Sequence, residues 1–462
     1  MSNKTNNIIK ELAELPSRAL EKTVDETARV LEVINERKTL KGLRRFWNIL
    51  GPGLITGAAD DDPSGIGTYS QAGSQFGLGA LWLSLYSFPF MAVIQEICAR
   101  IAMMTGKGLM ANVKDRFPRW IVTTTVIGLA IANIFNIGVD LGAMAASTRL
   151  LLPAISFNAL VFFFAVLSIV LQIYLPYKTY TRYLKWLALV VIAYIFSAAS
   201  LHLPWITVLR HTIIPSSISF SSETIIMITA ILGTTISPYL FFWETGQEIE
   251  EEIAHGRRTI SKRRGATHTE IKRMRIDVWS GMFLSNLVMF FIIATCWATL
   301  NRNGITTIQT AAQAAEALRP FAGSFAYLLF TVGIIGTGIL AIPTLAGSVA
   351  YAVSECFGWK EGLYRTLKQG RAFYGVIIIS MMIGLAMNFI GIDPIKALVA
   401  AAVVNGIIAP IMLALVMRLS DDPTVMGPWK NNHLTSLLGW IITMIMSVAS
   451  IATIIFLYSG RL

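Results

Sequence analysis

Charged residues are scarce in this chain. They make up 14% of its 462 residues, whereas hydrophobic residues make up 54%. Apolar runs of roughly 20 residues recur along most of the length, and each is long enough to cross a lipid bilayer. The short alternating segments typical of a transmembrane β-barrel do not appear. The sequence therefore predicts an all-α polytopic membrane protein embedded in a lipid bilayer.

Cysteine is also rare. Cys98, Cys296 and Cys356 stand apart in or beside apolar segments, and no CxxC pair occurs. This spacing favours thiols packed in the core over a disulfide or a zinc site. The chain contains no P-loop, no HExxH motif and no nucleophile–base motif. These absences argue against an enzyme and against ATP-driven transport, and we expect no cofactor.

Hydropathy predicts about eleven membrane spans. They fall near residues 46–76, 79–104, 120–147, 155–175, 182–202, 222–245, 277–300, 320–352, 373–391, 394–418 and 434–459. If the N-terminus is cytoplasmic, the inward loops hold most of the basic residues that give the net charge of +11. The positive-inside rule then predicts a plasma-membrane protein, in a bacterium the inner membrane, with its C-terminus outside. This topology explains the basic charge without a nucleic-acid partner.

The first 42 residues are polar and do not resemble a signal peptide. From Ser17 to Lys38 apolar residues repeat at helical spacing between charges. A helix packed on the protein's own loops is one interpretation, and a homo-oligomer contact through this helix is the other. We therefore divide the chain into a cytoplasmic helical extension, residues 1–42, and a membrane domain, residues 43–462.

Two of the predicted spans are interrupted near their middle. The first contains GPGLITGAADDDPSGIGTYSQAG, in which Asp60, Asp61 and Asp62 precede Pro63 and Ser64. The sixth contains GTTISPYLFFWE, with Pro238 inside it. Proline breaks a helix, and carboxylates are costly in hydrocarbon. Broken helices in matching places of two halves indicate the binding site of a transporter.

The two interrupted spans lie five apart, so they would run in opposite directions across the membrane. This pattern predicts an inverted repeat of five plus five helices. Repeat one would cover about residues 46–202, repeat two about residues 222–418, and residues 434–459 would form an extra helix.

These motifs resemble the Nramp superfamily of proton-coupled divalent-metal transporters. GPGLITGAADDDPSG is similar to the family's GPG start and DPGN break, and GTTISPY lies where the family has GATVMPH. SQFGLGALW and VIQEICARIAMMTGKGL resemble the family's AQFGYSLLW and LLQYLSARLGIVTGRDL. The resemblance is dense over Gly51–Leu109 and Gly233–Glu244 and diffuse elsewhere. It implies a LeuT-like fold with the substrate at both helix breaks.

The resemblance also implies a ligand set that departs from the family pattern. Asp62 corresponds to the family's metal-binding Asp, and Ala59 and Thr234 correspond to residues that supply backbone carbonyls. Gly65 stands where the family has a ligand Asn, Ser237 where it has Met, and Tyr239 where it has His. In the third span Asp140 is retained, whereas Ala143 replaces an acidic residue; in the tenth, Ala402 replaces a polar Gln and Asn405 lies one turn further on.

The remaining donor groups favour a hard cation. Carboxylates, hydroxyls and backbone carbonyls suit Mg²⁺, Ca²⁺ or Mn²⁺, whereas the missing thioether would suit softer metals. On an unwound segment two adjacent carboxylates can face one cavity, so Asp61 is a second candidate ligand. Gly65 and Ser237 are small, and we expect them to leave room for waters on the ion.

Proton carriers are few in this sequence. Tyr239 cannot exchange protons near neutrality as His does. Asp60, Asp61 and Asp140 are the remaining candidates, and Glu244 is a candidate for the inner part of the pathway. The acidic run Gln247–Glu252 that follows is expected to be a solvated helix end.

The functional hypothesis is a secondary transporter that moves Mg²⁺ or Mn²⁺ by alternating access with weak or absent proton coupling. A proton-coupled Mn²⁺/Fe²⁺ symporter is the first alternative. An ion channel, a membrane sensor and a transporter of another solute are further alternatives, and two broken helices in one repeat argue against the channel.

Overall fold

The structure is a computed structural model that describes residues 51–174, 193–201, 203–215, 221–319, 323–391 and 393–459. The N-terminal extension with its proposed oligomer contact lies outside the described residues, as does most of the predicted span 182–202. The predicted domain and repeat boundaries stay predictions.

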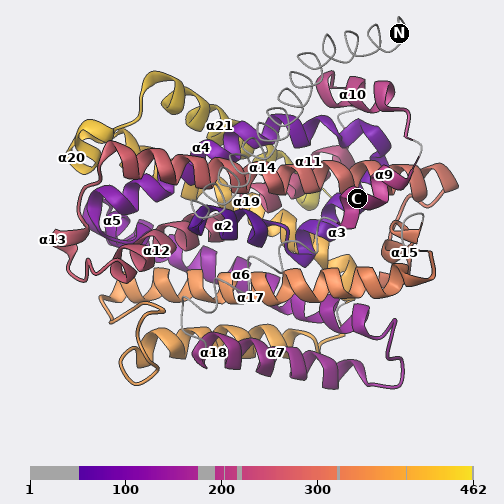
Figure 1. Ribbon diagram of the computed structural model, residues 1–462, viewed down its shortest axis with the longest axis horizontal. Coiled ribbons are helices and arrows are strands. Elements are labelled where there is room, and N and C mark those ends of the chain that lie inside the picture. Colours follow the sequence, from indigo (N-terminus) through magenta and orange to yellow (C-terminus); the bar gives the residue numbers. More distant parts are fainter. Residues whose placement is uncertain are drawn as a thin grey trace, which may run out of the picture. The chain divides into compact units, whose positions relative to one another are not determined.

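All regular elements of the described residues are helices, most of them running along one direction (Figure 1). The long helices are α4 (Trp82–Thr105), α6 (Arg119–Thr148), α7 (Phe157–Tyr174), α14 (His268–Thr299), α17 (Ala326–Phe357), α18 (Arg371–Met387), α19 (Pro394–Asp421) and α21 (His433–Tyr458). Two helices are broken, one into α2 (Pro52–Asp60) and α3 (Pro63–Phe76), the other into α11 (Ser222–Thr235) and α12 (Pro238–Ala254). Shorter connecting helices are α5 (Leu109–Arg116), α9 (Ala193–Ser200), α10 (Trp205–Ile213), α13 (Ile260–Arg263), α15 (Ala311–Glu316) and α20 (Pro423–Met426).

Eight segments of the described residues are long and apolar enough to cross a membrane, and α18 is a shorter apolar helix. Each of them coincides with a predicted span. The all-α membrane fold is confirmed, while the total of eleven spans stays a prediction. The outermost helices fit a lipid environment. Phe162, Phe163 and Val166 of α7 are more than two-fifths exposed, and α7 and α18 lie together at one edge in Figure 1.

Both predicted helix breaks are present. Pro63 opens α3 and Pro238 opens α12, each in the first turn, where its missing N–H needs no partner. The backbone of Asp62 and of Ser237 is extended, so each break is a short non-helical step between two half-helices.

The half-helix α2 packs backbone to backbone on α14. A Cβ on Gly57 would lie 2.3 Å from the carbonyl oxygen of Gly281, and one on Gly53 would lie 2.6 Å from the backbone of Val278. Gly53 and Gly57 are four residues apart and therefore lie on one face of α2. Only glycine permits so close an approach, and α2 is consequently held tightly against α14.

Candidate functional site

Asp62 sits at the first helix break and caps the helix that follows. One carboxylate oxygen accepts hydrogen bonds from the backbone N–H of Gly65 at 2.6 Å and the hydroxyl of Ser64 at 2.7 Å. The other accepts a hydrogen bond from the Asn136 side-chain amide at 2.8 Å. Asp62 is 1% exposed. This carboxylate is thus fixed by three donors at the point where α3 begins.

Asp60 and Asp61 share a different partner. The Ser285 hydroxyl of α14 lies 2.7 Å from an oxygen of Asp60 and 3.3 Å from an oxygen of Asp61. The backbone hydrogen bond at the start of α3 is accepted by Asp62, its N-cap. The two preceding carboxylates instead point toward α14.

The second helix break contributes hydroxyls and carbonyls. The Ser237 hydroxyl donates to the carbonyl oxygens of Gly233 and Thr234, at 2.8 and 2.6 Å. Tyr239 donates to the carbonyl oxygen of Ala59 at 2.9 Å and so joins the two breaks. In this conformation the carbonyls of Ala59 and Thr234, the two expected donors, each accept a hydrogen bond from the protein.

The space beside Gly65 is filled. A Cβ at this position would lie 3.1 Å from the Thr234 hydroxyl, 3.1 Å from the carbonyl oxygen of Asp60 and 3.3 Å from the Asp62 carboxylate. The expectation that Gly65 leaves room for waters is therefore wrong for this conformation. The close approach instead brings the two breaks together around Asp62.

Asp140 and Asn136 both extend toward the first break from α6. Asp140 lies near Asp62 and the backbone of Ser64. Apart from this approach to the Ser64 backbone, neither of its oxygens makes a well-directed hydrogen bond with the described residues, and its exposure is 0%. Asn405 of α19 is likewise buried, and both polar atoms of its amide lack a partner among the described residues. These polar groups are free for a ligand or for water.

Asn136 and Ser285 were not among the site residues predicted from the sequence. Asn136 precedes Asp140 by four residues and so shares its helix face, a spacing that could have revealed it. Ser285 lies in an apolar part of α14 with no comparable signal.

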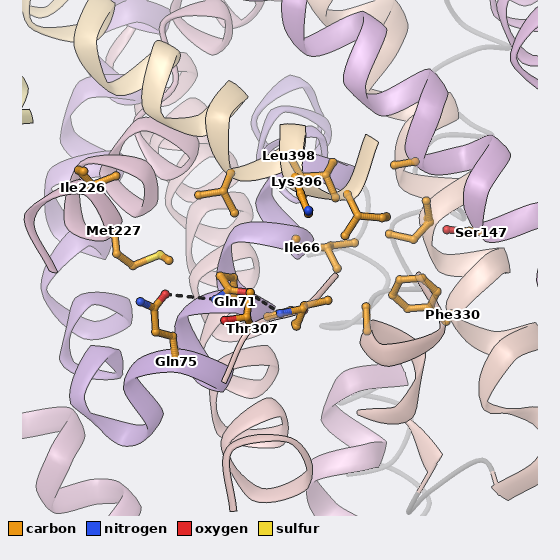
Figure 2. Close-up of a pocket in the computed structure, with 18 of the residues that line it drawn as sticks. Ile66, Gln71, Gln75, Ser147, Ile226, Met227, Thr307, Phe330, Lys396 and Leu398 are labelled. Atoms are coloured by element: carbon orange, nitrogen blue, oxygen red, sulfur yellow. Dashed lines mark hydrogen bonds between the residues drawn. The ribbon is translucent and has the colours of Figure 1, made fainter. Parts of the chain in front are cut away.

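A cavity of about 290 Å³ opens on the α3 side of the break (Figure 2). Its inner end is lined by Ile66, one turn after Asp62, and by Ala143. Toward its mouth Gln71 donates to Gln75 at 3.1 Å and Gln75 donates to Glu223 at 3.0 Å. Open space on the α3 side thus extends to Ile66, one turn from Asp62.

Polar groups are abundant on the α2 side, and every residue of α2 is buried. Glu244 of α12 accepts a short hydrogen bond from the Thr56 hydroxyl of α2. Asp277 of α14 accepts hydrogen bonds from the first backbone N–H groups of α2, Gly53 at 2.8 Å and Leu54 at 3.2 Å. Two carboxylates therefore hold α2 in place on this side.

The acidic run after Glu244 is not a solvated helix end. Gln247, Glu248, Glu250 and Glu252 are each less than a tenth exposed. Glu250 accepts hydrogen bonds from the Tyr351 hydroxyl at 2.7 Å and from the backbone N–H of Leu363 at 2.6 Å. That expectation was wrong because loop and helix segments distant in sequence cover this face of α12.

Comparison with known proteins places the chain in one family. Residues 53–456 match the family described as Natural resistance-associated macrophage protein-like, or Nramp. The chain belongs to the Nramp family. Similar proteins named divalent metal cation transporter MntH occur in Aeromonas hydrophila and Deinococcus radiodurans, each 24% identical, covering 85% and 88% of this chain and 92% and 89% of the relatives. Nramp members are transporters, so the chain is not an enzyme.

Solved structures agree on the fold. An Eremococcus coleocola manganese transporter is similar with a TM-score of 0.69 and 16% identity, covering 89% of this Nramp chain and 87% of that one. MHP1, a nucleobase-cation-symport-1 family transporter, has a TM-score of 0.54 at 14% identity and covers 89% and 92%. The LeuT-like architecture implied by the family resemblance is confirmed. In the described residues no three His, Cys, Asp or Glu side chains are assembled to hold a bare metal ion.

Proposed function

We propose that this Nramp chain is a secondary transporter that carries Mg²⁺ or Mn²⁺ through the Asp62 site by alternating access. The observation that carries the proposal is the Asp62 carboxylate, buried where the two broken helices meet, with a cavity on the α3 side that reaches Ile66 one turn away. A charge at this depth in a membrane protein is costly and is normally retained for function.

The chemistry of the site supports a hard cation. The groups that surround Asp62 are the Ser64 hydroxyl, the Asn136 amide, the nearby Asp140 carboxylate and the Tyr239 hydroxyl. All of these side chains offer oxygen or amide groups, and Ser237 stands where the family resemblance implies a thioether. Oxygen ligands suit Mg²⁺ and Mn²⁺ better than soft ions such as Cd²⁺. The ion would replace hydrogen bonds that now occupy the Asp62, Ala59 and Thr234 oxygens.

Orientation follows from the loop charges. α13 and the segment around it carry a dense group of basic residues, and this end lies opposite α15 in Figure 1. By the positive-inside rule the α2 side faces the cytoplasm and the α3 side faces outward. The cavity that leads to Ile66 is then the outer entrance, and the packed α2 side is the closed inner exit.

Proton coupling is proposed to be weak or absent. Tyr239 stands in place of the family's His, and its hydroxyl donates to the carbonyl oxygen of Ala59. The membrane potential alone can drive uptake, because two charges gain roughly 4.6 kcal/mol per 100 mV. The alternative is a proton-coupled Mn²⁺/Fe²⁺ symporter; the MntH relatives are named divalent metal cation transporters, a description that fits either proposal.

Ion uptake into proteoliposomes at a fixed potential tests both parts of the proposal. Mn²⁺ and Mg²⁺ should enter and saturate with concentration, whereas the lumen should not acidify in step with entry. Absence of uptake for both ions would refute the function. Acidification that tracks ion entry would support the symporter instead.

A further inference from the structure

One face of α12 carries three polar side chains that the central site does not use. Glu244, Gln247 and Glu248 follow the spacing i, i+3, i+4, so they lie on the same side of the helix. Their residues are 0%, 0% and 6% exposed. This face adjoins α2, since Glu244 binds Thr56. It lies between the Asp62 site and the α2 end of the molecule.

The polar atoms of this face are not satisfied within the described residues. Both atoms of the Gln247 amide and one oxygen of Glu244 are buried and lack a hydrogen-bond partner. Neither Glu244 nor Glu248 appears in an ion pair with a described Lys or Arg. Buried carboxylates and amides normally have partners, because leaving them without any costs on the order of 1 to 3 kcal/mol each. A buried, unpaired amide beside two carboxylates therefore indicates a missing ligand of positive charge.

We propose that Glu244, Gln247 and Glu248 form a second binding site for a partly hydrated divalent cation on the α2 side of the transport path. Two carboxylates and one amide oxygen supply fewer ligands than Mg²⁺ or Mn²⁺ requires, so waters complete the coordination. The identity of the ion rests on the proposed function, whereas the existence of the site rests on α12 alone.

Access to this site depends on α2. Asp277 caps the start of α2 and Glu244 binds Thr56, so these two carboxylates hold α2 over the face. When α2 separates from α12, Glu244 loses a hydroxyl donor and becomes available to the ion. The site would then receive the cation that leaves Asp62, one step closer to release.

Counting bound Mn²⁺ on the purified full chain by electron paramagnetic resonance tests the proposal. The wild type should bind two ions, and Asp62→Asn should keep one. Adding Glu248→Gln to Asp62→Asn should weaken the remaining site about tenfold, because removing one charged ligand lowers affinity strongly. Glu251→Gln is the matched control, since Glu251 lies on α12 with a side chain 43% exposed.

The same count is made with Gly57→Ala, which should free α2 from α14. If Asp62→Asn bound no Mn²⁺, both with Gly57 present and with Gly57→Ala, the proposed second site would be overturned. Equal weakening by Glu248→Gln and Glu251→Gln would overturn it too, because it would mean diffuse attraction. If Asp62→Asn retained both bound ions and full uptake, the proposed transport site at Asp62 would be refuted, whereas the second site on α12 would not.

Discussion

The two halves of the first broken helix differ in what surrounds them. α2 touches the backbone of α14 at Gly53 and Gly57, and two carboxylates bind its first turns. α3 borders an open cavity through Ile66, Gln71 and Gln75. One polypeptide segment is therefore tightly packed at one end and borders a cavity at the other.

This difference shows how a site can be exposed to one side of a membrane at a time. The carboxylate of Asp62 lies at the break between α2 and α3. Opening the α2 side requires breaking a glycine contact and two polar contacts, whereas the α3 side is already open. Substitutions at Asp62, on α2 and at the second break test this difference between the two halves.

Replacement of Asp62 should have the largest effect. Asp62→Asn removes the charge and keeps a side chain that caps a helix as well as Asp does, so α3 should still form. We expect Mn²⁺ uptake to fall about 100-fold or more, as for loss of an essential metal partner. Uptake by proteoliposomes measures it, with size-exclusion behaviour as the test of folding. Wild-type uptake would place the cation elsewhere.

Gly57→Ala should loosen α2 alone. The Cβ of the new alanine would lie 2.3 Å from a backbone oxygen of α14. Such overpacking destabilises the packed state by roughly 1 to 3 kcal/mol. The fraction of molecules in which α2 has separated from α14 should therefore rise about tenfold or more. Cys98 is buried near Glu244 and reports this opening through its reaction with a thiol reagent. Mass spectrometry of the Cys98 peptide gives the rate.

Two comparisons control this experiment. Gly79→Ala adds a methyl group to open space, so it should leave labelling unchanged. Cys296 is close to Gly73 on the α3 side, and its reactivity should not rise with that of Cys98. A parallel rise at both thiols would indicate general unfolding and contradict the comparison of the two halves.

Ser237→Met should change ion preference by a smaller amount. The substitution brings a thioether to the second break and removes a hydroxyl that now binds Gly233 and Thr234 carbonyls. We expect Cd²⁺ to gain several-fold over Mg²⁺ in competition for uptake. Ser237→Ala removes the hydroxyl without adding sulfur and should not show this gain. An unchanged preference in Ser237→Met would mean that residue 237 does not face the ion.

The smallest effect is expected at Glu361, which lies in the loop that follows α17 and near Glu250 of α12. Burial, together with Glu355 and Glu250, raises the pKa of Glu361 from its usual 4.5 to about 9. The folded protein therefore holds a proton that the unfolded chain releases, so stability falls as pH rises between these values. Glu361→Gln should reduce the loss of thermal stability between about pH 6 and pH 9. Identical melting profiles would show that the Glu361 carboxylate is solvated.

The sequence predicted the features that depend on local chemistry. Pro63 and Pro238 located both breaks because proline cannot continue a helix, and the apolar runs located the spans. The central role proposed for Asp62 followed from the motif around it. The roles of Asp60 and Asp61 could not be deduced, because Ser285 comes from a helix more than 220 residues away.

The burial of the α12 acids could not be predicted either. A run of Glu residues is usually solvated, and only the packing of Tyr351 and Leu363 against Glu250 reverses this expectation. Likewise, the small size of Gly65 suggested free space, whereas the fold uses that space to bring Thr234 close. In both places the outcome depends on contacts between residues that are far apart in the sequence.

The central claim is that Asp62 organises an oxygen-rich site for a hard divalent cation. Isothermal titration of the purified protein with Mg²⁺, Mn²⁺ and Cd²⁺ tests it most directly, with Asp62→Asn measured in parallel. The account predicts binding of Mg²⁺ and Mn²⁺, no preference for Cd²⁺ over Mn²⁺, and loss of the tighter binding event in Asp62→Asn. A strong preference for Cd²⁺, or binding in Asp62→Asn that matches the wild type, would contradict it.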